Sequence, residues 1–136
     1  MNAIVRINDQ NPEYTSMTCG TKEEKASFYN AVENPKYKLS EFINKKLTIV
    51  HVAMEAITLV ERDEDGEPTG VVKDAVKIVF INEKGEGIIS TSSGVLRCLY
   101  SLFKIFGTPD TWDEPITVTV RQLEIGKNRT FKLEVC

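Results

Sequence analysis

The chain has few of the residues from which metal and redox sites are built. It holds one histidine, His51, and three widely spaced cysteines, Cys19, Cys98 and Cys136. A lone histidine cannot form a metal cluster, and an odd number of scattered cysteines fits neither a disulfide framework nor a zinc site. The sequence therefore predicts a fold that needs no metal and no cofactor.

Long apolar runs and a secretory signal are also lacking. No stretch of apolar residues is long enough for a membrane-spanning helix. The N-terminal sequence MNAIVRINDQ has no basic segment followed by an apolar one. We therefore expect no membrane association and a cytoplasmic location.

Motifs for catalysis and nucleotide binding are missing as well. The sequence contains neither a GxxxxGK[ST] nor a GxGxxG pattern. Its adjacent carboxylates, such as Glu23 with Glu24, lie in polar segments where nothing would tune them for proton transfer. The hydroxyl-rich segment 90–94 could present backbone N–H groups to a phosphate, but capping a helix explains it more simply. We expect no enzymatic activity and no small-molecule substrate.

The 136 residues that are present can bury one core without disulfides. A net charge of -3 argues against a uniformly basic nucleic-acid binder, although local clusters of lysine and arginine decide the affinity for phosphates. Basic clusters lie within residues 36–46 and 127–132, and residues 61–67 are strongly acidic. We predict an N-terminal arm or edge strand, only partly ordered, over residues 1–25, and one folded domain over residues 26–136.

Alternating apolar residues dominate the chain after residue 46. They predict strands over residues 47–60, 71–81, 87–91, 116–125 and 130–135, with an amphipathic helix near 94–106. Five strands with a helix between the third and the fourth is the element order of an OB-fold. The predicted fold class is therefore all-β with one helix, an OB-fold-like five-stranded barrel.

The first of these strands changes its apolar face near Ala56, where Ile57 and Leu59 take over. Such a slip is typical of a bulge or bend, and a small barrel needs one where a strand serves both sheets. The acidic stretch that follows contains Asp65-Gly66, a turn signal, which predicts a solvent-exposed hairpin tip.

Capping residues mark the helix ends. Ser92 or Ser93 can cap the amphipathic helix, and Gly107 ends it. Further upstream, Thr21 to Glu24 fits a capping box, yet residues 26–32 could equally form a strand.

Proteins that hold single strands combine basic side chains along the phosphates with aromatic rings that stack on bases. We expect Tyr29 to be a stacking ring because an extended segment would turn its neighbour Phe28 inward. Tyr37 lies between two lysines, although a tyrosine that covers the barrel mouth is an equally good interpretation. The candidate phosphate contacts are Lys36, Lys38, Lys45, Lys46, Lys73, Lys77, Arg121, Lys127 and Arg129.

Five motifs occur in a defined order: Phe28-Tyr29-Asn30-Ala31, residues 37–44, residues 90–94, residues 105–109, and the pair 116–122 with 129–133. In this order and spacing the chain resembles the single-stranded DNA-binding proteins of bacteriophages that infect Gram-positive bacteria. The resemblance covers about residues 26 to 135. It implies an OB-like fold, cooperative coating and protection of displaced strands during phage replication without sequence choice, and no enzymatic activity. The stacking tyrosines of that family carry over to Tyr29 and Tyr37.

A second hypothesis is a protein-interaction module on the same small barrel, such as a phage accessory or inhibitory protein that binds no nucleic acid, because fold does not dictate function. The two hypotheses differ in what the basic clusters do. Clusters that line one groove with Tyr29 and Tyr37 favour DNA binding, whereas clusters on opposite faces favour protein binding. The expected partners are single-stranded DNA and further copies of the chain along the strand.

Overall fold

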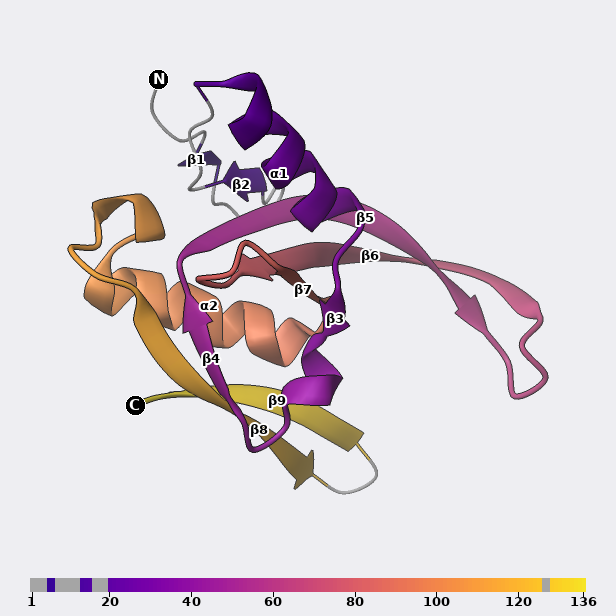
Figure 1. The fold of residues 1–136 in the computed structure, drawn as a ribbon. Coiled ribbons are helices and arrows are strands. Elements are labelled where there is room, and N and C mark those ends of the chain that lie inside the picture. The colour runs from indigo at the N-terminus through magenta and orange to yellow at the C-terminus, as the bar shows by residue number, and fades with distance from the viewer. Residues whose placement is uncertain (1–4, 7–12, 16–19, 126–127) are drawn as a thin grey trace.

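Most of the chain is β-structure, accompanied by two α-helices (Figure 1). The computed structural model describes residues 5–6, 13–15, 20–125 and 128–136. In chain order the elements are β1 (Val5–Arg6), β2 (Glu13–Thr15), α1 (Lys22–Glu33), β3 (Tyr37–Lys38), the 3-10 helix η1 (Leu39–Phe42), β4 (Lys46–Ile49), β5 (His51–Arg62), β6 (Pro68–Ile81), β7 (Gly87–Ser90), α2 (Ser93–Phe106), the 3-10 helix η2 (Pro109–Thr111), β8 (Ile116–Ile125) and β9 (Asn128–Val135).

The strands form two sheets, in the orders β1-β2-β5-β6-β7-β3 and β4-β8-β9. The strands and the helix expected after residue 46 are present, except that the first strand is divided into β4 and β5, which belong to different sheets. The expectation of one helix is wrong, because α1 is a second, and the described strands do not close into a five-stranded barrel. The reason is β3, which pairs in parallel with β7 and so takes the edge that would have to meet the other sheet for closure. Periodicity could not predict this strand, because a segment of two residues shows no alternation.

One long strand does serve both sheets, although the bend lies at Val50 and not near Ala56. Val50 separates β4 from β5, and its N–H donates to the Ile81 carbonyl at 2.9 Å. At Ala56 the pairing with β6 continues in register, opposite Val76. What changes there is burial: β5 is buried up to Met54, and farther along it leaves the core. The apparent slip in the sequence therefore marks the point where the strand becomes exposed.

The main core lies between the two sheets and α2. Its fully buried side chains include Leu47, Phe80, Leu99 and Val118. α2 packs closely against β9: a side chain at Gly94 would have no room, since its Cβ would collide with Thr130 Oγ1. A smaller cluster lies on the other face of the six-stranded sheet, beneath α1.

Residues 22–33 are helical, so the strand alternative for this segment is wrong. The Thr21 hydroxyl accepts the Glu24 N–H at 3.1 Å, as the capping box predicts. Ser92 caps α2 in the same way, and Gly107 ends that helix with a φ of 84°. α1 spans the boundary expected at residue 25, while β1 and β2 lie at the edge of the six-stranded sheet.

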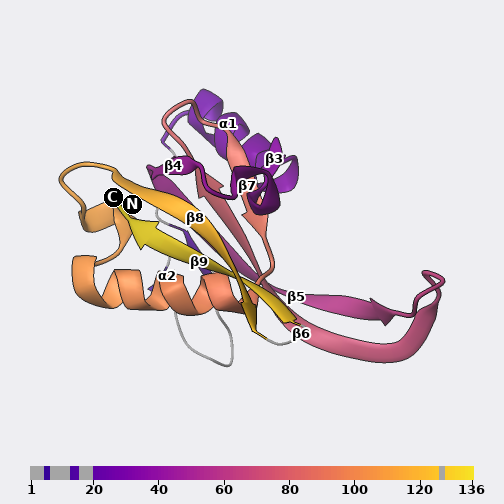
Figure 2. The same cartoon turned by 90° about the horizontal axis from the view of Figure 1, so that it is seen from below.

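The hairpin of β5 and β6 projects from the body of the molecule, as Figures 1 and 2 show. We call residues 57–75 the arm. Its tip is the acidic turn that the sequence predicts, where the Asp63 carboxylate accepts the N–H groups of Asp65 and Glu67. Among the described residues, no helix has the length and apolarity that crossing a membrane requires.

Candidate nucleic-acid interface

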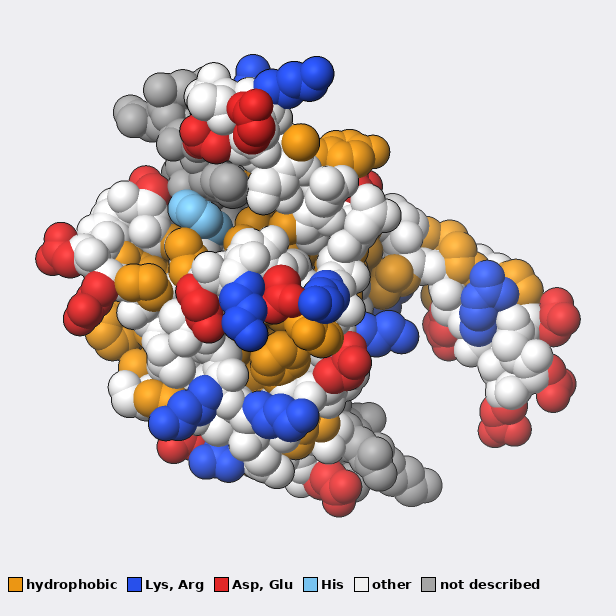
Figure 3. Space-filling view, viewed as in Figure 1, with side chains coloured by type: hydrophobic (Ala, Val, Ile, Leu, Met, Phe, Trp, Pro, Cys, Tyr) orange, Lys and Arg blue, Asp and Glu red, His pale blue; other side chains and the backbone are white. Residues whose placement is uncertain are grey.

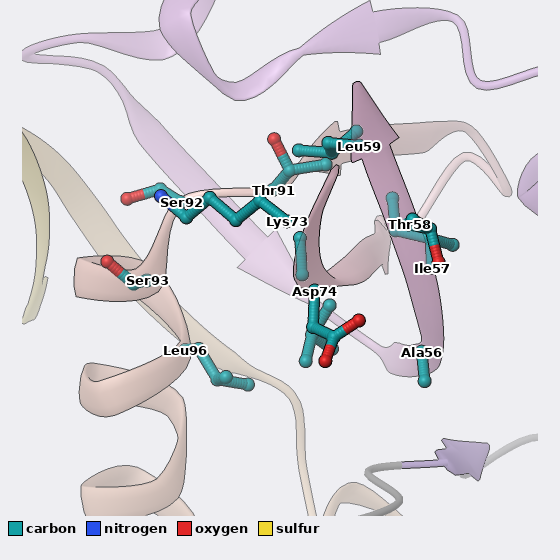
Figure 4. Close-up of a pocket in the computed structure, with 12 residues that line it drawn as sticks. Ala56, Ile57, Thr58, Leu59, Lys73, Asp74, Thr91, Ser92, Ser93 and Leu96 are labelled. Carbon is teal, nitrogen blue, oxygen red and sulfur yellow. The ribbon is translucent and has the colours of Figure 1, made fainter. Parts of the chain in front are cut away.

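Two adjoining hollows open where the arm leaves the body. The larger, of about 910 Å³, is bordered by η1, β7, β9 and the start of α2, and we call it the basal groove. The smaller, of about 420 Å³, lies between the arm and α2 and is drawn in Figure 4. Residues that line both are Leu59, Lys73, Thr91, Ser92 and Ser93.

Strand register places three of the predicted lysines on one face of the six-stranded sheet. Lys38 pairs with Ile89, which in turn pairs with Val79 on β6. Side chains alternate along a strand, so Lys77 and Lys73 share the face of Val79. Lys38 and Lys73 both line the basal groove, while Lys77 is half-buried nearer the body.

Hydroxyl groups surround the basic end of this groove. The Ser92 hydroxyl accepts the Val95 N–H at 3.4 Å, and the Ser90 hydroxyl accepts the Ser92 N–H at 3.2 Å. Figure 4 shows the Lys73 side chain extending from β6 toward Ser92. A cation beside the N-terminus of a helix creates a positive potential, which suits a phosphate.

Lys36 contributes no unpaired charge, because its ammonium lies 2.7 Å from the Glu86 carboxylate. The hydrogen bond and the charge of Glu86 raise the pKa of Lys36. The same bond, together with one from Asn82, lowers the pKa of Glu86. The sequence could not indicate this pairing, because it depends on β3 and the β6–β7 turn lying side by side.

The two predicted stacking tyrosines lie in different surroundings. Tyr29 is 63% exposed, but it is on α1 and not in an extended segment, and it lines neither hollow. Tyr37, expected to face solvent, is half-buried against the core. Its ring meets Phe42 edge-on with centroids 5.4 Å apart, and the Lys36 ammonium lies 5.4 Å from its centroid. Tyr37 therefore packs on the core, while the barrel mouth that the alternative interpretation had it cover is not found among the described strands.

The remaining basic residues belong to the other sheet or lie outside the described side chains. Lys45 and Lys46 are exposed at β4, and Lys46 pairs with Thr119 of β8. Arg121 donates to Asn44 Oδ1 at 2.9 Å and lies 3.4 Å from Glu134. Lys127 and the side chain of Arg129 are not among the residues described. The predicted cations are therefore divided between two surfaces.

Several groove residues were not predicted as binding residues. Phe131 was expected only in the core, yet this half-buried ring also lines the basal groove. Leu59 was assigned to a bend, but it lies at the base of the arm. The hydroxyls of segment 90–94 do cap α2, as expected, and they line the groove as well. Their density before a helix was the one available signal.

The described residues hold no group of three or more side chains suited to a metal ion. His51 is half-buried, and burial lowers its pKa. No protein-family model, no curated protein and no solved structure matches the chain. The geometry of the basal groove and of the arm is therefore the basis for a functional assignment.

Proposed function

We propose that this protein binds single-stranded DNA without sequence choice and coats and protects it during phage replication. The strand would run through the basal groove, beside the first hairpin of an OB-like arrangement. The order of elements from β4 to β9 supports this assignment. So does the position of the groove at the base of a hairpin and the start of a helix.

The observation that carries the proposal is the convergence of Lys38 and Lys73. The two lysines come from strands that are not neighbours in the sheet, yet both line one open groove. Among the ion pairs recorded for the described residues, none involves either ammonium. Phe131 adds an aromatic ring to the same groove. Cations along a path and a ring beside it are what a flexible phosphate backbone with unstacked bases requires.

A protein-interaction role is the second candidate, and the division of the basic residues over two sheets favours it. Arg121 and Lys46 lie on the three-stranded sheet, apart from the basal groove. The two roles are compatible, because Lys46 and Arg121 do not line the basal groove, although β9 of the same sheet borders it. Binding of DNA therefore has to be tested with the groove residues alone.

The test measures the fluorescence anisotropy of a labelled oligo(dT) across a salt series. The wild-type protein should bind at low salt and release the strand as salt rises. Lys38→Ala and Lys73→Ala should each lower the slope of log K against log salt by about 0.7, the value for one lost phosphate contact on a single strand.

Lys104→Ala is the matched control, because Lys104 is an exposed lysine in the last turn of α2 and lines neither hollow. Its slope should equal that of the wild type. An absence of binding at low salt would contradict the proposal, and so would a slope unchanged by loss of both groove lysines.

A further inference from the structure

The arm is a two-stranded ribbon without neighbours on either edge in the described part of the chain. β2 pairs with β5 only at Met54 and Ala53, and β7 pairs with β6 only from Ile78 onward. Beyond these positions the two strands pair only with each other. A lone two-stranded hairpin is at best marginally stable in water, so an ordered arm of this length indicates a surface that a partner covers.

Exposed apolar side chains on the arm also indicate that a partner covers it. Val60 and Val72 face each other across the ribbon and are 49% and 62% exposed. Val71, 51% exposed, lies on the opposite face, as does Leu59. An unprotected ribbon with apolar side chains and open edges favours contact with another chain.

The negative charge at the tip of the arm indicates which kind of partner surface the arm binds. Residues 61–67 contain five carboxylates and one arginine, and Figure 3 shows acidic side chains gathered at the end of the arm. Such a tip repels the phosphates of a nucleic acid and attracts a cationic protein surface.

This chain itself has such a surface. Lys46, Arg121 and Lys132 project from the outer face of the three-stranded sheet, since Lys46 pairs with Thr119 and Arg121 pairs with Lys132. We call these three residues the basic face. Leu123, 39% exposed, lies on the same face of β8 as Arg121 and offers an apolar contact. Glu134, a carboxylate opposite Thr119, lies on the same face and is paired with Arg121.

We propose that the arm of one copy docks on the basic face of a second copy. In Figures 1 and 2 the tip of the arm lies away from the three-stranded sheet of its own chain, so the contact joins two molecules. Two copies whose arms docked on each other's faces would form a closed pair; the proposed association is instead the head-to-tail series, in which each added copy leaves one tip and one face free. This association does not depend on the binding of DNA.

Sedimentation velocity of the full chain, without DNA, tests the proposal across protein concentration and salt. The wild type should form a series of oligomers that grows with concentration and dissociates as salt rises. The tip variant is Glu64→Lys with Glu67→Lys, which spares Asp63 because that carboxylate holds the turn. The face variant is Lys46→Glu with Lys132→Glu, which spares Arg121 because it is bonded to Asn44.

Each variant alone should associate roughly tenfold or more weakly, because the tip variant has no net charge over residues 61–67 and the face variant sets acidic residues against the acidic tip. An equal mixture should recover association into pairs, since the native tip of the face variant fits the native face of the tip variant. Val60→Thr with Val72→Thr, which keeps β-branched residues on the ribbon, should also weaken association. Circular dichroism and the Tm of every variant establish that it is folded.

A wild type that stays monomeric at all concentrations would overturn the proposal. A closed dimer that the tip variant leaves intact would overturn it as well, because that result indicates two arms packed on each other. A mixture that associates no better than its components would exclude the pairing of tip with face.

Discussion

Gly87 lies where α1 crosses β7, and it shows how closely these two elements approach. A Cβ at this position would lie 2.1 Å from the Ala31 carbonyl oxygen, which is backbone and cannot rotate away. Gly87→Ala should therefore lower the free energy of unfolding by about 1–3 kcal/mol, the usual range for overpacking. Chemical denaturation measures this difference.

Gly20→Ala is the matched control for that substitution. No atom lies within 4 Å of a Cβ placed at Gly20, so its stability should stay close to that of the wild type. Equal stability of the Gly87 variant and the wild type would show that α1 does not pack on β7 as described.

The pair of Lys36 and Glu86 gives a prediction on pH. The pKa of Glu86 is lowered from 4.5, so its contribution is present above that pH and is lost as the pH falls through the folded value. The pKa of Lys36 is raised from 10.5, so its contribution is lost only as the pH rises through a still higher folded value. Glu86→Gln should therefore lower the Tm near neutral pH, and the difference should vanish in acid.

Glu83→Gln serves as the comparison, because Glu83 is exposed in the same turn. Its Tm should follow that of the wild type at every pH. A Tm difference for Glu86→Gln that is as large in strong acid, where the carboxylate is protonated in the folded protein, as at neutral pH would exclude the ion pair as its cause.

At the scale of elements, the sequence predicts the strands and α2 well because alternation and capping are local properties. Ser92, Gly107 and the turn at Asp63 all act as their sequence context indicates. For residues 26–32 the sequence does not decide between helix and strand, since apolar residues in a short segment fit both the helical and the strand period. The location of the basal groove could not be predicted, because it depends on β3 joining β7 across a long separation in sequence.

The arm should be the least protected part of the sheet. Its strands have open edges in the described chain and few buried side chains, whereas Val52 and Phe80 are fully buried. Hydrogen exchange measured at low protein concentration should find arm amides exchanging faster by orders of magnitude than those around Val52 and Phe80. Slow exchange that disappears on dilution would indicate protection by a second copy, and slow exchange at every concentration would contradict the isolated ribbon.

At the scale of the whole molecule, the net charge of -3 conceals a separation of charge. Residues 61–67 at the end of the arm hold five carboxylates and one arginine, whereas basic and acidic side chains are mixed on the body (Figure 3). If copies join tip to face on a strand, the tip variant should lose cooperativity on long poly(dT). It should keep its affinity for an oligonucleotide that holds one molecule.

Titration of both substrates followed by anisotropy measures these two quantities separately. The Lys73→Ala variant should behave in the opposite way, with lower affinity for the short strand and unchanged cooperativity. If both variants lost affinity for the short strand and cooperativity on the long strand to the same extent, the groove and the tip of the arm would not act as separate surfaces.

The bend at Val50 also governs the order in which the protein can assemble. β5, β6 and β7 follow one another along the chain, so we expect them to pair before the strands that are distant in sequence. β4 must wait for β8: Thr48 and Thr117, whose hydroxyls lie 3.0 Å apart, are separated by 69 residues. Until β8 has been synthesised, Leu47 and Ile49 lack their partner strand, so we expect the nascent chain to expose a short apolar segment there.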